Sequence, residues 1–84
     1  MEAIKEKIRQ SGLKATPQRL AIYSAMQKLG HASADMITEE LAKVFPSLTT
    51  ATVYNVLESF VGVGLLVRRC SSNNKMYFDV NTYG

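Results

Sequence analysis

The chain has 84 residues, of which 46% are hydrophobic, and this apolar content can form a core and argues against a disordered protein. It carries 10 Lys and Arg residues against 7 Asp and Glu, a net charge of +3 that permits nucleic-acid binding without requiring it. A single cysteine excludes an internal disulfide framework, and no apolar run approaches the roughly 20 residues of a membrane span. We therefore expect a cytoplasmic protein with no membrane partner.

The N-terminal third of the chain predicts two helices. Residues 2–11 place two isoleucines four positions apart and are followed by a glycine, which is typical of a helix end. Thr16 followed by Pro17 is a typical helix start, with threonine as the cap and proline in the first turn. The second helix is expected to reach about Leu29 and to stop at Gly30. Its predicted buried residues are Leu20, Ile22 or Tyr23, Met26 and Leu29.

A third helix is expected after Ser33, whose hydroxyl can cap it. It should end at Phe45, because the residue before Pro46 is disfavoured in the α conformation. Its predicted apolar stripe consists of Met36, Ile37, Leu41 and Val44.

A fourth helix follows, capped by Ser47 or Thr49 and ended by Gly62 or Gly64. Apolar residues recur along it at helical spacing, which predicts one buried face. That face consists of Val53, Leu57, Phe60 and Val61.

Residues 65–70 and 75–80 predict two strands, joined by the turn-forming residues 71–74. The fold class is therefore mainly α with a small antiparallel β-hairpin, in the order αααα-ββ. This order is that of a winged helix-turn-helix, and we expect residues 1–84 to form one such domain. Only a few residues separate the third and fourth helices, which suits a motif whose second helix enters the DNA major groove. The hairpin would be the wing.

The fourth helix has a polar but uncharged outer face near its start, and hydroxyl and amide groups there suit base edges. No Lys or Arg lies between Ser47 and Leu66, so phosphate contacts must come from other segments. The candidate base-reading residues are Thr49, Thr50, Thr52, Tyr54 and Asn55. The candidate phosphate-binding residues are Lys14, Arg19, Arg68, Arg69 and Lys75.

Each of these assignments has a plainer alternative. Tyr54 could pack against the wing, Asn55 could be solvated, and the cations could be ordinary surface charges. Arg68 and Arg69 are neighbours on a strand and point to opposite faces, so at most one should face DNA squarely.

Four blocks of the chain resemble the N-terminal domain of the ferric uptake regulator (Fur) family in order and approximate spacing. They are TPQR at 16–19, HASAD at 31–35, FPSLTTATVYNVL at 45–57 and YFDV at 77–80. The resemblance implies a bacterial, metal-dependent transcription repressor with a winged-helix DNA-binding domain. It also implies a C-terminal dimerisation and metal-binding domain, which is absent from this chain. We expect a homodimer on an A·T-rich inverted repeat of double-stranded DNA for the full-length protein, and a monomer for this piece.

The resemblance also implies roles for individual residues. Tyr54 corresponds to a tyrosine that contacts thymine and backbone, and Asn55 resembles the asparagine of peroxide-sensing members. Lys14 lies where members carry a lysine that reaches a minor groove, and Arg19 matches a backbone-contacting arginine.

His31 and Asp79 match two ligands of the regulatory metal in peroxide-sensing members. Two ligands are too few for a tight iron or manganese site, so the others would come from the absent domain. We therefore expect no cofactor in this piece, and regulatory Fe or Mn with structural Zn in the full-length protein. Aspartate at position 79, where iron-sensing members often have glutamate, favours the peroxide-sensing branch.

The leading hypothesis is thus a sequence-specific DNA-binding domain of a metal- or peroxide-responsive repressor. The alternative is a winged-helix module that binds proteins and not DNA, because fold alone does not settle function. A single-domain metal sensor is a third hypothesis, weakened by having only two candidate ligands. We expect no enzyme, because the sequence offers no catalytic set of residues and no glycine-rich phosphate loop.

Overall fold

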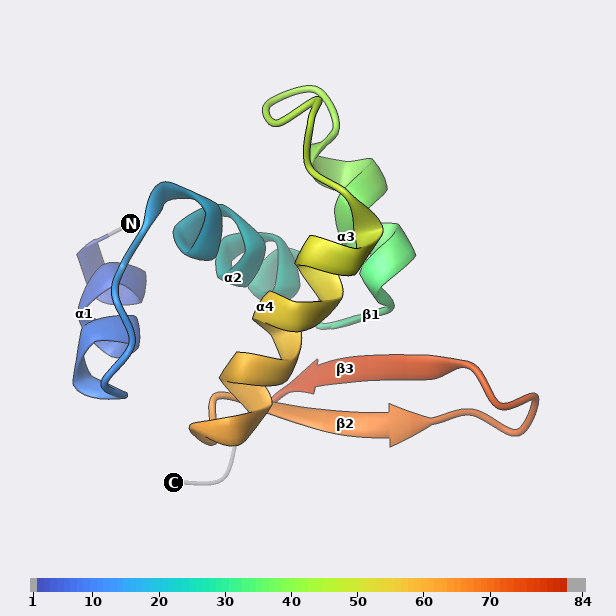
Figure 1. The fold of residues 1–84 in the computed structure, drawn as a ribbon. Helices are drawn as coiled ribbons and strands as arrows, with labels where there is room; N and C mark the ends of the chain where they lie inside the picture. The colour runs from blue at the N-terminus through green and yellow to red at the C-terminus, as the bar shows by residue number, and fades with distance from the viewer. Residues whose placement is uncertain (1, 82–84) are drawn as a thin grey trace.

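The structure, a computed structural model, describes residues 2–81 and contains four helices and a three-stranded antiparallel sheet (Figure 1). The predicted fold class, four helices followed by an antiparallel hairpin, is confirmed. The sequence did not predict the short additional strand β1. The elements are α1 (Glu2–Gln10), α2 (Pro17–Leu29), β1 (His31–Ala32), α3 (Ala34–Leu41), α4 (Thr50–Gly62), β2 (Leu66–Cys70) and β3 (Met76–Val80).

Hydroxyl caps fix the starts of three helices, as the sequence predicts. Thr16 Oγ1 accepts the Arg19 N–H at 3.2 Å at the start of α2, and Ser33 Oγ accepts the Met36 N–H at 3.3 Å at the start of α3. For α4 the sequence left two caps open, and the structure uses Thr49. These caps satisfy amide groups that have no partner inside the helix, so they set where each helix begins.

The predicted end of α3 is wrong. This helix stops at Leu41 rather than at Phe45, and turns occupy the residues that follow. Ala42 N–H bonds to the carbonyl three residues earlier, and Val44 N–H bonds to Leu41 O at 3.0 Å. Such tightened bonds unwind the last turn before the proline is reached. The connection between α3 and α4 is therefore residues 42–49, longer than expected.

The sheet has the strand order β1-β3-β2, so the hairpin carries a third strand on its β3 edge. In the register of β1 with β3, His31 is opposite Asp79 and Ala32 is opposite Phe78. Two residues are too short for a pattern of alternating side chains, so β1 could not be predicted from the sequence. The strand matters because it joins the α2–α3 connection to the wing.

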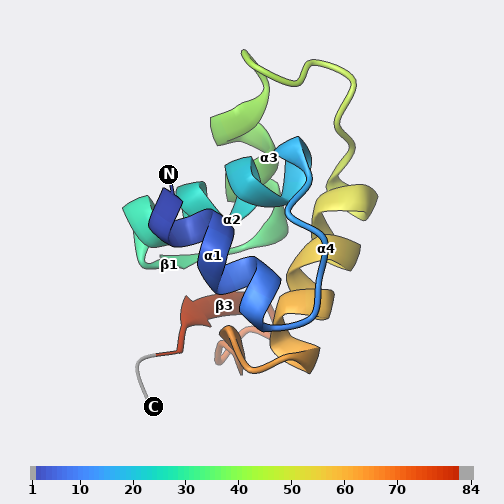
Figure 2. The same cartoon turned by 90° about the vertical axis from the view of Figure 1, so that its left-hand side faces the viewer.

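The core lies where α2, α3 and α4 meet the sheet, and α1 covers α2 from outside (Figure 2). Tyr23 and Phe60 meet edge to face with ring centroids 5.3 Å apart, and both are fully buried. Both residues considered for the second helix, Ile22 and Tyr23, are buried. No helix among the described residues is long and apolar enough to cross a membrane.

Three predicted core positions are wrong. Leu29 is 37% exposed, Met36 is 40% exposed and Val44 is 69% exposed. Val44 lies beyond the true end of α3, so helical spacing no longer places it against the core. Leu29 is the last residue of α2, and Met36 is turned away from the neighbouring buried Ile37.

Candidate nucleic-acid interface and metal-ligating pair

The packing of α4 exposes the polar start of the helix. Val53 and Leu57 are fully buried and hold one face of α4 against the core. The opposite face leaves Thr50, Tyr54 and Asn55 exposed to solvent. The candidate base-reading residues therefore lie together on an open surface of one helix.

The polar side chains at the start of α4 differ in whether they already make hydrogen bonds within the protein. Thr49 Oγ1 accepts the Thr52 N–H and lies 3.0 Å from Thr52 Oγ1, so both hydroxyls are engaged in the helix cap. Among the described residues, Thr50 and Asn55 have no side-chain hydrogen bond. Their side chains are therefore available to an outside partner, whereas those of Thr49 and Thr52 already form the hydrogen bonds of the helix cap.

Tyr54 stands where α4 meets the wing. Its ring meets Phe78 edge to face, with centroids 5.9 Å apart, yet the residue is 39% exposed. The Tyr54 ring therefore packs against the wing along one edge, as the alternative interpretation of the sequence proposed, while part of the residue stays open to solvent. The Glu58 carboxylate raises the pKa of the Tyr54 hydroxyl, first by hydrogen bonding and then by repelling the phenolate.

Lys14 lies in the loop between α1 and α2, and Arg19 in the first turn of α2 bonds to that loop. Arg19 Nη1 donates to the backbone carbonyl of Lys14 at 3.1 Å, which ties the loop to the start of α2. Lys14 itself is exposed. Figure 1 shows this loop on one side of α4 and the turn of the hairpin on the other.

Both wing arginines are paired with acids. Arg68 Nε lies 3.1 Å from Glu58 Oε2, and Arg69 Nε pairs with Asp79 Oδ2. Lys75, at the end of the hairpin turn, is exposed and has no ion pair with any residue in the described range. Side chains alternate between the two faces of β2, so the two arginines have different partners. Neither partner could be predicted from the sequence.

The two predicted metal ligands lie side by side. His31 Nδ1 donates to Asp79 Oδ1, as the register of β1 with β3 allows. The His31 ring also stacks on Tyr77, with centroids 4.6 Å apart and planes 20° apart. Burial of the Asp79 carboxyl acts to raise its pKa, but the bonds from His31 and Arg69 outweigh it and hold the pKa below its usual value.

This pair fits half of a metal site. One imidazole and one carboxylate are donors that Fe and Mn accept, and they are already adjacent. No cluster of three or more His, Cys, Asp or Glu side chains that could hold a metal occurs within residues 2–81. A tight site would therefore need ligands that this part of the chain does not provide.

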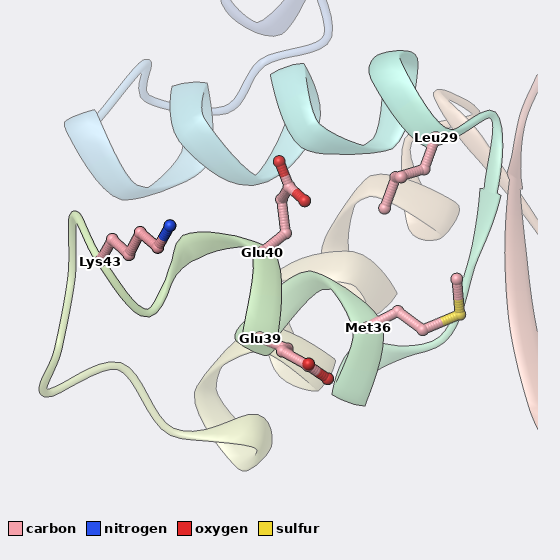
Figure 3. A pocket seen from close by; sticks show the side chains of 5 residues that line it. All are labelled: Leu29, Met36, Glu39, Glu40 and Lys43. Carbon is pink, nitrogen blue, oxygen red and sulfur yellow. The ribbon is translucent and has the colours of Figure 1, made fainter.

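A shallow hollow of about 480 Å³ lies between the end of α2 and α3 (Figure 3). None of the candidate DNA or metal residues lines it. Its lining residues are Leu29, Met36, Glu39, Glu40 and Lys43. Two of the mispredicted core residues, Leu29 and Met36, therefore line this hollow.

Comparison with known proteins points to one family. The model of the Ferric uptake regulator family matches residues 10–84. The Peroxide-responsive repressor PerR of Staphylococcus aureus is 35% identical over 77 residues, which is 90% of this chain and 52% of that protein. This chain thus spans about half the length of the relatives it matches.

Solved structures agree. The ferric uptake regulator from Pseudomonas aeruginosa with manganese superposes with a TM-score of 0.84 at 29% identity, over 95% of this chain and 61% of that one. PerR from Streptococcus pyogenes, described for peroxide sensing and gene regulation, gives 0.80 at 37% identity, over 94% and 55%. A family match over most of the chain, together with these likenesses, establishes that the chain belongs to the ferric uptake regulator family.

Proposed function

We propose that this chain is the sequence-specific DNA-binding domain of a metal- or peroxide-responsive transcriptional repressor. The observation that carries the proposal is the exposed, uncharged polar start of α4, placed between two basic segments. Base edges in the major groove are read by such groups, and phosphates are held by cations on either side. Family membership supports the same conclusion.

In this proposal the contacts divide by element. Thr50, Tyr54 and Asn55 read base edges, and an Asn side chain can bond to adenine in a two-point contact. Lys14 and Lys75 hold phosphates or an adjacent A·T-rich minor groove on the two sides of α4. Arg19 supports the Lys14 loop through its bond to the backbone, and its charge remains available to a phosphate.

The regulatory part rests on His31 and Asp79. We propose that they supply two ligands for Fe or Mn, with the rest coming from sequence beyond this chain. A bound metal would supply positive charge and a fixed link between these two residues and the other ligands. The full-length protein is proposed to carry structural Zn and to bind an inverted repeat as a homodimer, with one α4 in each half-site.

The test begins with selection of duplexes from a random pool by the 84-residue chain, followed by affinity measurements over a range of salt. We expect an A·T-rich motif and affinity that falls linearly on a log–log plot as salt rises. Tyr54→Ala should weaken binding to the selected duplex by about 5- to 150-fold, which corresponds to about 1–3 kcal/mol for a base contact. Binding to a scrambled duplex should change little.

The negative outcomes are distinct. No enriched motif and no salt dependence would reject DNA binding and favour the protein-interaction alternative. An equal loss on both duplexes for Tyr54→Ala would make Tyr54 a backbone or folding residue. Thr50→Ala, a second change at a proposed base-reading residue, should likewise weaken binding to the selected duplex more than binding to the scrambled one.

A further inference from the structure

One acidic side chain lies on the surface proposed to meet DNA. Glu58 is the only acid in the sequence of α4, and it follows Tyr54 by one helical turn on the same face. Its side chain is 28% exposed. A carboxylate at this position repels the phosphates of DNA and so opposes binding.

The neighbours of Glu58 come from both α4 and the wing. Its Oε2 atom lies 3.1 Å from Arg68 Nε, which joins α4 to the first wing strand. Tyr54 precedes it by one helical turn on the same face, and the Glu58 carboxylate raises the pKa of the Tyr54 hydroxyl. One carboxylate therefore pairs with a candidate phosphate-binding residue and lies one helical turn from a candidate base-reading residue.

The sheet completes the arrangement. Arg68 is the direct cross-strand partner of Phe78, and Phe78 meets the Tyr54 ring at 5.9 Å. The tyrosine ring is thus held at its edge by Phe78, and the Glu58 carboxylate acts on its hydroxyl from one helical turn away. These contacts restrict the ring before any ligand arrives, and pre-ordered groups lose less entropy on binding.

The pairing also changes what Arg68 can do. An arginine paired with a carboxylate must give up that partner before it can neutralise a phosphate. The pair is partly exposed, with Arg68 at 49%, so solvent screens it and it can open. Phosphate binding through Arg68, which is the same on every sequence, is thereby weakened relative to base reading by Tyr54.

We propose that Glu58 is a specificity-determining residue that positions Tyr54 for base reading and withholds Arg68 from non-specific phosphate binding. This inference rests on the proposed function and deepens it. Glu58 itself contacts no base in this account. It acts through its two neighbours.

The decisive variant is Glu58→Gln, which keeps the shape of the side chain and removes its charge. We expect several-fold tighter binding to scrambled duplex and a lower ratio of selected to scrambled affinity. The slope of log affinity against log salt should become steeper by about one, because one more cation neutralises a phosphate. Glu39→Gln on α3 is the matched control, since it makes the same charge change at an exposed position away from α4.

Two further measurements keep the result specific. Adding Arg68→Gln to the Glu58→Gln variant should return the salt slope to its original value, because the released cation is then gone. Independently of DNA, titration of the Tyr54 ring by NMR should show its pKa falling toward the usual value in Glu58→Gln and not in Glu39→Gln.

The outcomes separate the two levels of inference. If the native chain selects a motif but Glu58→Gln has the slope and discrimination of Glu39→Gln, the role of Glu58 is refuted while the proposed function stands. If the native chain binds no duplex at any salt, the proposed function fails and the role of Glu58 fails with it.

Discussion

Replacing Arg69 by glutamine should strengthen binding of Mn²⁺ to His31 and Asp79. In the structure Arg69 pairs with Asp79 Oδ2, so a cation of the chain itself occupies part of the carboxylate that a metal would use. Metal binding then requires this ion pair to weaken. Glutamine keeps much of the side-chain length and removes the charge.

The size of the effect follows from exposure. Arg69 is 59% exposed and Asp79 is 23% exposed, so solvent screens the pair. Ion pairs of this kind contribute about 0.2–1 kcal/mol, and removing that competition should tighten binding by up to about fivefold.

Arg68→Gln is the control for this prediction. It removes the same charge one residue away, but Arg68 pairs with Glu58 and not with Asp79. Any general effect of a more negative protein on a divalent cation therefore appears in both variants. Only the difference between them measures the competition at Asp79.

The assay is an NMR titration of the 84-residue chain with Mn²⁺, following paramagnetic broadening of the His31 and Asp79 signals. Equal dissociation constants for the two variants would refute the competition. Broadening centred on other residues would refute the assignment of the ligand pair itself.

Two other substitutions give independent checks. Tyr23→Phe should stabilise the domain by about 1 kcal/mol in urea unfolding. The reason is that the buried Tyr23 hydroxyl has no hydrogen-bond partner among the described residues, and an unpaired buried group is costly. The control is Tyr77→Phe, at a half-buried position, which should change the free energy of unfolding by no more than about 0.5 kcal/mol. A loss of stability in Tyr23→Phe would show that the hydroxyl is satisfied after all. Lys14→Ala should reduce the salt slope of DNA binding by about one, and an unchanged slope would remove Lys14 from the interface.

The sequence was most informative where the chemistry is local. Helix caps depend on a residue and the amide three positions later, so Thr16 and Ser33 could be identified directly. The buried stripe of α4 followed from spacing alone, and Val53, Leu57 and Phe60 are fully buried. The end of α3 depended on how its last turn tightens, which the sequence pattern does not encode.

What the sequence could not show are the pairings across elements. β1 is two residues long, and its contact with β3 joins positions 48 apart in the chain. Only the family resemblance brought His31 and Asp79 into one hypothesis, and the structure then placed them in contact. The acids that hold the wing arginines come from a helix and from the neighbouring strand, so neither pair has a local signal.

These pairings change how the positive charge of the chain should be counted. From the sequence, five cations are available to hold phosphates. In the structure, Arg68 and Arg69 are each held by a carboxylate, which cancels their charge at short range. Of these five candidates, Lys14, Arg19 and Lys75 have no carboxylate partner among the described residues.

The count has a measurable consequence for the isolated chain. Each neutralised phosphate contributes about −0.9 to the slope of log affinity against log salt, so three cations predict a slope of about −2.7 and five predict about −4.5. A slope near the smaller magnitude would mean that both ion pairs persist on DNA, whereas the larger magnitude would mean that they open and that phosphates displace the acids. A domain with the smaller count holds DNA weakly by itself. Tight binding to an inverted repeat would then depend on a second copy, which raises the effective concentration of the first at its half-site.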